Sequence, residues 1–526
     1  MLNMSEHQST SMMKRARRNT LGDLLSRTVA RNPHKQAFTF KERTVTYEQL
    51  DELVNQTAHG MLEKGIQKGD RLALLSKSSL DFVIVIFAAA KIGAVTIPIN
   101  YMLTKNDIAY ILNHAEVTAL FSAKEYTDIL QEATEEADRN IEHYYVLEES
   151  EPFEQWQPLK MLQENNNKKS VEAELFDDEL AQVLYTSGTE SNPKGVMLSH
   201  KSIISEYVSC VVDGKMSDAD VLVHALPFYH SAQLHVFLGP SIYLGASGII
   251  LDKADPAVIM ETIEQQKATQ LFAPPTVWIA LLRHADFDKY VLDSLEKCYY
   301  GAAIMPREVL KELAERLPNA SFWNFYGQTE VAPLATALQP EDQLRKLGSA
   351  GRPTLHVETK IVDDDDKEVA RGEIGEIVHR TPHAMLGYLN DPEKTAQAFK
   401  NGWFHSGDLG TMDDEGYITI VDRKKDIINT GGVSVSSREI EELIYQIKAV
   451  AEVAVIGLKD DYWIEAITAI IVLKDGETLT EEEVMSFCHE KLSTFKTPKF
   501  VYFIESLPKN LSGKVLKKDL RELYEA

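Results

Sequence analysis

The residues with the most evident chemistry stand together in one stretch, Tyr185-Thr-Ser-Gly-Thr-Glu-Ser-Asn-Pro-Lys-Gly195. Its glycines let backbone N–H groups approach a ligand closely, and successive N–H groups form a concavity that binds anions. Its hydroxyls add donors, and Lys194 adds a positive charge for phosphate oxygens. An ordinary polar turn also uses Gly, Ser, Asn and Pro, but it needs neither the hydroxyl cluster nor the lysine. We therefore expect a phosphate site formed by Thr186, Ser187, Gly188, Thr189 and Lys194.

This stretch differs from an ordinary P-loop, in which Gly-Lys-Ser/Thr opens a helix after a strand. Here the lysine precedes the glycine, and the residues that follow, Val196 to Leu198, are apolar and extended. Ala181 to Leu184 also has the composition of a strand. The loop is therefore predicted to join two strands, and a helical pattern begins only after Ser199.

A second motif, Asn324-Phe-Tyr-Gly-Gln-Thr-Glu330, follows an apolar strand. Tyr326 can stack on a base, and Thr329 can donate to a phosphate. Glu330 offers hard oxygen atoms to Mg²⁺, which usually binds through one or two carboxylates together with substrate phosphates. We expect a nucleotide site here, with Glu330 as the metal ligand, formed by Asn324, Tyr326, Gly327, Thr329 and Glu330.

In their order along the chain, these motifs resemble those of the adenylate-forming superfamily, which includes acyl-CoA synthetases, peptide-synthetase adenylation domains and luciferases. The family's usual loop is Thr-Ser-Gly-Thr-Thr-Gly-x-Pro-Lys-Gly, and Glu190-Ser191 replaces its second Thr-Gly here. Residues 326–330 match the family's Tyr-Gly-x-Thr-Glu. The resemblance covers nearly the whole chain, from about Leu21 to Leu523.

The resemblance implies further site residues in the second half of the chain. Trp403-Phe-His-Ser-Gly-Asp408 matches a family segment whose aspartate accepts from both ribose hydroxyls, which implies that role for Asp408. Arg423 matches an arginine that contacts the ribose, and Lys425 matches the family's hinge position. Where the family has glycine before Glu465, this chain has Ile464.

The C-terminal part carries the family's catalytic lysine. Pro508 to Lys514 matches the pattern Pro-x-x-x-x-Gly-Lys, which implies that Lys514 catalyses adenylate formation, with Thr329 and Glu330 as its partners. The family's C-terminal lid then rotates about the hinge and presents Gly431-Gly432 to coenzyme A in the second half-reaction.

Two further segments are candidates for the wall of a substrate pocket. Ala225-Leu-Pro-Phe-Tyr-His230 is aromatic and apolar, and a satisfied core histidine is the default interpretation of His230. In the resembling families this segment lies near the acyl pocket. Gly301, Ala302 and Ala303 lack bulk, as a site for a flat ring or a chain requires, although close packing alone would also explain them. We assign Tyr229, His230, Gly301 and Ala302 to the acyl pocket, and Ala302 and Ala303 also to the nucleotide site.

Strands and helices alternate between Thr46 and Phe121, which predicts a layered α/β architecture. We expect a polar basic arm over 1–20, a large N-terminal domain of layered sheets and helices over 21–424, and a small, mobile α+β lid over 425–526. The basic cluster Lys14 to Arg18 favours a solvated or disordered arm, with a membrane-surface role as the alternative. Asp363 to Asp366 is predicted to be a solvated hairpin tip without a functional role.

The composition excludes several classes of function. The net charge of −25 over 526 residues repels polyanions, which argues against general nucleic-acid binding. The three cysteines have no paired spacing, which indicates a reducing compartment and argues against a metal cluster. No signal peptide is evident, and the apolar run Phe82 to Ile99 is interrupted by Lys91 and Gly93, so we expect a buried helix and strand. A cytoplasmic protein without stable membrane insertion is predicted, and a homodimer is compatible with the sequence.

The resemblance implies an AMP-forming carboxylic acid–CoA ligase that uses ATP, Mg²⁺ and coenzyme A. No carrier domain follows Lys514, so free coenzyme A is the expected thiol. Phe228, Tyr229, Val236 and Phe237 suggest an apolar pocket, which favours a medium- or long-chain fatty acid over an aromatic acid. The alternatives are a stand-alone enzyme that loads a carrier protein, a luciferase-like oxygenase, and an inactive nucleotide-binding relative.

Overall fold

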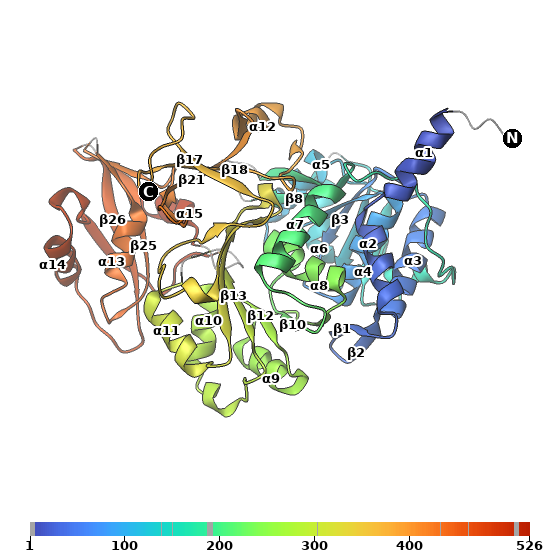
Figure 1. Ribbon diagram of the computed structural model, residues 1–526, viewed down its shortest axis with the longest axis horizontal. Helices are drawn as coiled ribbons and strands as arrows, with labels where there is room; N and C mark the ends of the chain where they lie inside the picture. Colours follow the sequence, from blue (N-terminus) through green and yellow to red (C-terminus); the bar gives the residue numbers. More distant parts are fainter. Residues whose placement is uncertain are drawn as a thin grey trace. The chain divides into compact units, whose positions relative to one another are not determined.

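The computed structural model describes residues 6–137, 139–149, 151–186, 193–301, 303, 305–431, 433–460, 462–509 and 515–525 (Figure 1). The chain divides into two compact units. Unit 1 contains Met1–Leu347, Pro353–Glu358 and Arg380–Ala398, and unit 2 contains Gly348–Arg352, Thr359–His379 and Phe399–Ala526. The predicted α/β class, with a large N-terminal part and a small C-terminal part, is confirmed. The mobility of the C-terminal part and the hinge at Lys425, which lies inside unit 2, stay predictions.

The first sheet of unit 1 carries the phosphate-loop strands at one side. Its strands follow the order β19-β9-β8-β4-β3-β5-β6-β7. Strands β3 to β8 pair in parallel, and β9 pairs antiparallel with both β8 and β19. The strands are β3 (Arg71–Leu75), β4 (Val95–Pro98), β5 (Ala119–Ala123), β6 (His143–Leu147), β7 (Gln157–Pro158), β8 (Leu180–Thr186), β9 (Lys194–Ser199) and β19 (Gly387–Tyr388). Helices α3 (Tyr47–Glu63), α5 (Lys105–His114), α6 (Thr127–Glu136) and α7 (His200–Asp213) belong to the same part of the chain.

The second sheet of unit 1 follows the order β16-β15-β14-β13-β12-β10-β11-β1-β2. Helices α9, α10 and α11 bury one apolar stripe each against β10, β12 and β13 (Figure 1). The helices are α8 (Gly239–Leu244), α9 (Pro256–Gln266), α10 (Pro275–Arg283) and α11 (Arg307–Arg316). The strands are β1 (Gln36–Phe40), β2 (Arg43–Thr46), β10 (Val221–His224), β11 (Ser247–Ile250), β12 (Gln270–Phe272), β13 (Lys297–Gly301), β14 (Ser321–Gly327), β15 (Leu334–Leu338) and β16 (Arg352–Pro353).

Helix α4 (Leu80–Ile92) is apolar on nearly every side, and a helix of this kind is stable only when it is buried. Its single buried cation, Lys91, is paired with Asp51 at 2.6 Å and donates to Asn55 Oδ1 at 2.7 Å. Gly93 ends the helix in the left-handed conformation, with φ +78°. The expectation of a buried helix is confirmed, and none of the helices in the described part of the chain is long and apolar enough to cross a membrane.

Unit 2 contains two smaller sheets. One has the order β17-β18-β21-β20 with β22 beside β21, and the other has the order β24-β23-β26-β25 with β27 beside β26. Helix α12 (Pro392–Ala398) belongs to unit 1, whereas α13 (Ser437–Ile444), α14 (Glu481–Lys491) and α15 (Lys517–Glu525) belong to unit 2. The strands are β17 (Glu358–Val362), β18 (Gly375–Arg380), β20 (Phe399–Lys400), β21 (Trp403–Met412), β22 (Ile418–Arg423), β23 (Ile428–Thr430), β24 (Val433–Val435), β25 (Val450–Asp460), β26 (Ile464–Leu473) and β27 (Phe500–Phe503).

The acidic run Asp363 to Asp366 is a hairpin tip, as predicted. The Asp363 N–H donates to the Lys367 carbonyl, and the Asp363 carboxylate accepts from the N–H groups of Asp365 and Lys367. Asp364 is 91% exposed and pairs with Lys424 at 2.8 Å. Asp365 pairs with Lys367 at 3.1 Å, and the Asp366 carboxylate accepts from Asn401 at 2.7 Å. The carboxylates therefore serve the turn itself and contacts at the surface.

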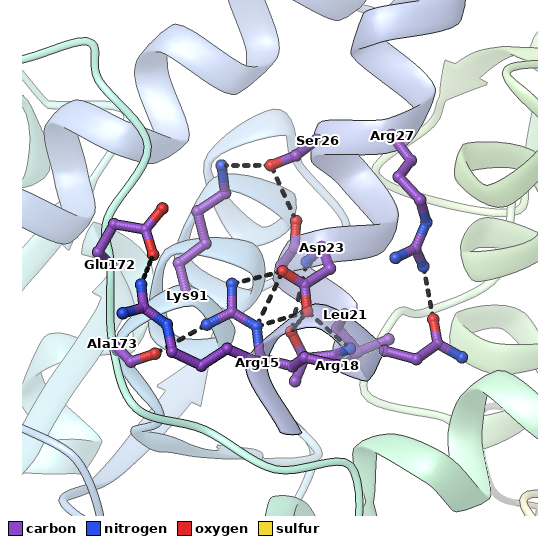
Figure 2. Close-up of polar contacts among 12 residues, drawn as sticks. Arg15, Arg18, Leu21, Asp23, Ser26, Arg27, Lys91, Glu172 and Ala173 are labelled. Carbon is purple, nitrogen blue, oxygen red and sulfur yellow. Dashed lines mark hydrogen bonds and ion pairs between the residues drawn. The ribbon is translucent and has the colours of Figure 1, made fainter. Parts of the chain in front are cut away.

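The N-terminal arm is more ordered than the sequence suggested. Glu6–Arg17 forms helix α1, followed by α2 (Leu21–Arg31), and residues 12–17 are exposed. Of the two predicted alternatives, the solvated arm therefore agrees with the structure over these residues, and the disordered arm does not. Figure 2 shows the reason: Arg15 pairs with Glu172, and Arg18 donates to the Ala173 carbonyl at 2.8 Å and to Asp23. The acidic segment that precedes β8 supplies partners for the basic cluster, which the sequence pattern alone did not reveal.

Candidate functional site

The predicted strand–loop–strand around the phosphate motif is present. Strands β8 and β9 pair antiparallel, with Thr186 directly opposite Lys194 and Tyr185 opposite Gly195. The hairpin therefore brings the hydroxyl at the end of one strand and the cation at the start of the next to the same end of the sheet. Ser187, Gly188 and Thr189 lie outside the described residues, so their role stays a prediction.

One side chain, Tyr388, links the phosphate motif to the second motif. The Tyr388 hydroxyl donates to Glu330 Oε1 at 2.9 Å, and Lys194 Nζ lies 5.3 Å from the centroid of the Tyr388 ring. Strand β19 holds this tyrosine opposite Val196 of β9. No sequence motif singled out Tyr388, and the available signal was an aromatic residue after Gly387.

A second contact joins Ser231, the residue directly after the segment 225–230, to the same motif. The hydroxyl groups of Ser231 and Thr329 are 2.9 Å apart, and Ser231 is buried. Ser231 precedes a π-helical turn, Ala232–Leu238, a type of turn that is frequent at functional sites. Ser231 was missed as well, because a lone serine after His230 has no distinctive spacing. The contact orients the hydroxyl that the sequence assigned to a phosphate.

The glycines at the ends of β13 and β14 are required by close backbone packing. A Cβ at Gly327 would lie 1.7 Å from the Pro333 carbonyl oxygen, and a Cβ at Gly301 would lie 2.4 Å from the Phe325 carbonyl oxygen. The close-packing interpretation of Gly301 is therefore sufficient, and its acyl-pocket role stays a prediction. Ala302 lies outside the described residues, and Ala303 is exposed. Asn324 and Tyr326 are half-buried on β14.

The apolar segment that suggested a fatty-acid pocket is divided between core and site. Phe228, Val236 and Phe237 are buried, and the Phe237 ring stacks on Phe272 with centroids 4.4 Å apart. These three side chains pack in the core, so they are a correction to the pocket that the sequence suggested. The physical reason is that the π-helical turn directs Val236 and Phe237 against β12 and β13. Phe228 instead packs against Phe82 and His224.

Tyr229 and His230 are only half-buried, unlike typical core side chains. The Tyr229 ring meets Tyr101 edge to face at 5.4 Å, and Tyr101 stacks on Tyr126 at 5.4 Å. Burial raises the pKa of Tyr229 above its ordinary value, so its hydroxyl stays protonated. His230 Nδ1 accepts from the Ala232 N–H at 3.2 Å. Together these residues form an aromatic cluster, Tyr101, Tyr126 and Tyr229, beside the predicted pocket residue His230.

In unit 2 the two predicted ribose contacts are brought together. Asp408 of β21 and Arg423 of β22 are directly opposite each other, and Arg423 Nε lies 3.2 Å from Asp408 Oδ1. Asp408 is 5% exposed, and its N–H donates to Ser406 Oγ at 3.1 Å. A buried carboxylate with a fixed backbone beside a guanidinium can accept from two neighbouring hydroxyl groups.

The predicted hinge lysine and the coenzyme A glycines belong to the next strands. Burial, and after it the charge of Arg423, lower the pKa of Lys425 to about 8, although the residue as a whole is exposed. Gly431 has φ +59°, and its N–H donates to the Trp463 carbonyl at 2.6 Å. Gly432 and Lys514 lie outside the described residues.

The departure from the family pattern at Ile464 has a structural counterpart. Ile464 has φ +70°, in the left-handed region that glycine adopts freely and β-branched residues rarely adopt. It pairs with Thr430 at the start of β26. The fold therefore keeps the backbone conformation of a glycine at a position where the sequence has isoleucine.

A magnesium ion fits the donor set at Glu330. Within the described ranges, no group of three or more His, Cys, Asp or Glu side chains is placed to hold a metal ion. Glu330 is a single half-buried carboxylate whose Oε1 accepts from Tyr388. Such a carboxylate suits Mg²⁺, which enters with substrate phosphates and takes most of its ligands from them and from water.

Comparison with known proteins decides the family. A family model described as AMP-binding enzyme matches residues 25–389, and one described as AMP-binding enzyme C-terminal domain matches residues 439–514. The chain belongs to the AMP-binding enzyme family. This AMP-binding enzyme is thus a member of the AMP-forming acyl-CoA ligase superfamily, and the predicted resemblance is confirmed.

Three curated relatives match this AMP-binding enzyme over nearly their whole length. YngI of Bacillus subtilis (strain 168), named as an acyl-CoA synthetase, is 33% identical, with 96% of each chain covered. The feruloyl-CoA synthase of an Amycolatopsis species is 30% identical, with 96% of this chain and 99% of that protein covered. The long-chain-fatty-acid–CoA ligase FadD13 of Mycobacterium tuberculosis is 33% identical, with 96% and 99% covered.

Solved structures agree over the same extent. The anthranilate–CoA ligase AuaEII in complex with anthranoyl-AMP superposes with a TM-score of 0.88 at 26% identity, covering 96% of this chain and 97% of that one. ATP-bound MatB from Rhodopseudomonas palustris superposes with a TM-score of 0.87 at 30% identity, covering 96% and 99%. The enzyme class predicted from the motifs, an acid–thiol ligase, is confirmed by these relatives.

Proposed function

We propose that the protein is a carboxylic acid–CoA ligase whose substrate is a medium- or long-chain fatty acid. It forms an acyl adenylate from ATP with release of pyrophosphate, and then a thioester with coenzyme A. The observation that supports ligase activity best is the convergence of Lys194 and Glu330 on Tyr388. The fatty-acid assignment draws on the relatives named as long-chain-fatty-acid–CoA ligases.

The first half-reaction replaces a poor leaving group with a good one. An oxygen of the substrate carboxylate attacks the α-phosphorus of ATP, and the bond from that phosphorus to pyrophosphate breaks. The protein contributes positioning and charge neutralisation. Lys514 would stabilise the charge between the carboxylate and the α-phosphate, and Thr329, oriented by Ser231, would donate to the α-phosphate.

The remaining residues hold the nucleotide in place. Ser187, Thr189 and Lys194 would bind the departing pyrophosphate, and Asp408 with Arg423 would fix the ribose. Glu330 would hold Mg²⁺, which neutralises phosphate charge when bound. In the second half-reaction the thiol sulfur attacks the acyl carbon, and the carbon–oxygen bond to AMP breaks. Rotation about Lys425 would bring Gly431-Gly432 to coenzyme A.

An aromatic acid is the second candidate substrate, and one observation favours it. Tyr101, Tyr126 and Tyr229 form a contiguous aromatic cluster beside His230. Planar aromatic acids pack against such rings in offset or edge-to-face arrangements. The relatives include a feruloyl-CoA synthase.

The proposal also includes a cytoplasmic location and a homodimer. A cytoplasmic location suits the three unpaired, buried cysteines.

The proposal is tested by pyrophosphate release from ATP and Mg²⁺ across acids from acetate to long-chain fatty acids, with benzoate and cinnamate types included, with and without coenzyme A. We expect turnover for medium- or long-chain acids that depends on coenzyme A. Turnover with cinnamate-type acids alone would assign the aromatic class. Release that is indifferent to coenzyme A would point to a carrier protein, and no turnover with bound ATP would favour an inactive relative.

Lys514→Ala separates the two half-reactions. We expect this variant to lose adenylate formation by at least about 100-fold while it still makes thioester from supplied acyl adenylate. Equal loss of both half-reactions would contradict the assigned role of Lys514. The matched control is Lys518→Ala, which removes an exposed lysine from helix α15 and should leave both half-reactions unchanged.

A further inference from the structure

Tyr388 touches both charged groups that the proposed reaction needs. We propose that Tyr388 is a positioning residue that holds the Glu330 carboxylate toward magnesium with its hydroxyl and holds the Lys194 ammonium toward phosphate with its ring. This inference rests on the proposed function of Glu330 and Lys194. It adds a residue through which the carboxylate and the lysine act on one nucleotide together.

The backbone of Tyr388 is fixed from both sides. Its N–H donates to Thr395 Oγ1 at 2.9 Å, and Thr395 belongs to helix α12. The next N–H, that of Leu389, donates to the Gly195 carbonyl at 2.8 Å. Tyr388 itself is 9% exposed, so its ring cannot swing freely into solvent. A side chain on such a short, doubly anchored strand is a rigid support for its two partners.

The hydroxyl orients the carboxylate of Glu330. The bond from Tyr388 to Glu330 Oε1 is 2.9 Å long, and a hydrogen bond to an ionised group is stronger than one between neutral groups. The Glu330 carbonyl also accepts from the Met385 N–H at 2.8 Å. Residues 385–388 therefore hold both the backbone and the side chain of Glu330. The hydroxyl uses one acceptor position of the carboxylate and leaves others for a metal ion.

The ring orients the ammonium of Lys194 by a different interaction. At 5.3 Å from the ring centroid, Lys194 Nζ lies within the range of a cation–π contact. Such a contact restrains a flexible lysine and leaves its charge in place, whereas a carboxylate partner would neutralise that charge. The positive charge therefore stays available to phosphate oxygens.

Because the two contacts use different parts of one side chain, two substitutions separate them. Tyr388→Phe removes the hydroxyl and keeps the ring, whereas Tyr388→Leu removes both. The measurement is ATP affinity by isothermal titration calorimetry, with the full-length protein, once with Mg²⁺ and once with EDTA. We expect Tyr388→Phe to weaken binding of Mg²⁺–ATP about 10-fold and to leave metal-free ATP unchanged. Tyr388→Leu should weaken both.

Glu330→Gln provides the reference for the magnesium arm. It should abolish the gain in affinity that Mg²⁺ gives, and adding Tyr388→Phe to it should cause no further loss, since both act through one carboxylate. Additive losses, or equal weakening of metal-free ATP by Tyr388→Phe, would overturn the inference while the proposed function stands. If Glu330→Gln keeps the full effect of Mg²⁺, the metal role of Glu330 is itself wrong.

Tyr47→Phe is the matched control for the loss of a buried phenol. The Tyr47 hydroxyl donates to the Ala246 carbonyl at 2.6 Å, and the residue lies at the start of helix α3. We expect this variant to lower the unfolding temperature by about as much as Tyr388→Phe does, and to keep the ATP affinity of the wild type in both conditions. A drop in Mg²⁺–ATP affinity in Tyr47→Phe as large as that in Tyr388→Phe would assign the effect to stability and overturn the positioning role.

Discussion

Arg423 Nε lies 3.2 Å from Asp408 Oδ1, and the two residues stand opposite each other in the antiparallel pair β21–β22. We predict that Asp408→Asn weakens ATP binding about 10- to 100-fold, because it removes the charge that accepts from ribose hydroxyls. Calorimetry with ATP and with 2′,3′-dideoxy-ATP measures this. The variant should also lose the preference for ATP over the dideoxy analogue, and a retained preference would show that Asp408 does not contact the ribose.

Ile464→Gly is predicted to stabilise the protein. Holding a β-branched residue at φ +70° costs about 1–2 kcal/mol, and the side chain is 54% exposed, so little burial is lost. The extra flexibility of glycine in the unfolded chain offsets about half of this gain. We expect the unfolding free energy to rise by up to about 1 kcal/mol in urea titrations. Val433→Gly, at a half-exposed strand position in the same unit, should lower it, and a loss in both variants would contradict the strain.

Buried histidines should make unit 1 sensitive to acid. Burial lowers the pKa of His200 and His383 to about 4, and that of His224 and His235 to about 3. The unfolded chain therefore binds more protons than the folded chain below the ordinary histidine pKa of about 6.5. The contribution of these neutral histidines to the free energy of unfolding is complete above that pH. It falls as the pH drops toward their pKa values in the folded state. By about pH 5.5, each histidine should have lowered the free energy of unfolding by about 1 kcal/mol.

Urea titrations from about pH 7.5 to about pH 5 measure this acid sensitivity. His200→Asn should flatten the pH dependence by one histidine's share, because asparagine can accept from the Leu21 N–H in place of His200 Nδ1. His34→Gln is the control, since the His34 side chain is 84% exposed. An unchanged slope in His200→Asn would show that His200 is not held neutral by burial.

The N-terminal contacts in Figure 2 predict a stability effect of Arg18. Although burial opposes it, the hydrogen bond from Arg18 holds the pKa of Asp23 below its usual range. Arg18→Met should lower the unfolding free energy by about 1–3 kcal/mol, because it leaves Asp23 without its charged partner. Arg17→Met, one residue earlier on the exposed end of helix α1, should change it by less than about 0.5 kcal/mol. Equal effects would show that the contacts of Arg18 contribute nothing specific.

Local patterns carried much of the fold and part of the site. Apolar and turn patterns predicted the strands β8 and β9, which the structure pairs. The family motifs gave Asp408 and Arg423, which the structure places opposite each other. By contrast, the Tyr388–Glu330 and Ser231–Thr329 contacts join residues 58 and 98 positions apart. They depend on strand order and on a π-helical turn, neither of which leaves a periodic signal in the sequence.

The apolar residues after His230 failed as pocket predictors for a related reason. Composition shows that a segment is buried, but not whether its side chains face a ligand or other side chains. Phe237 is surrounded by Phe272, Tyr299 and Phe325, and its ring contributes to the core. Likewise, Arg15 and Arg18 of the basic cluster bind groups more than 150 positions away in the sequence. These groups are the Glu172 carboxylate and the Ala173 carbonyl.

Strand β19 also determines when the first sheet can be completed during synthesis. It is the outermost strand beside β9, and it leaves the ribosome long after β9 does. Until Gly387 and Tyr388 have emerged, the outer edge of β9 carries unpaired N–H and C=O groups, which are a template for pairing with another chain. A nascent or truncated chain that ends before Gly387 is therefore exposed to edge-to-edge aggregation, because β19 is the strand that pairs with Val196 and Met197 of that edge.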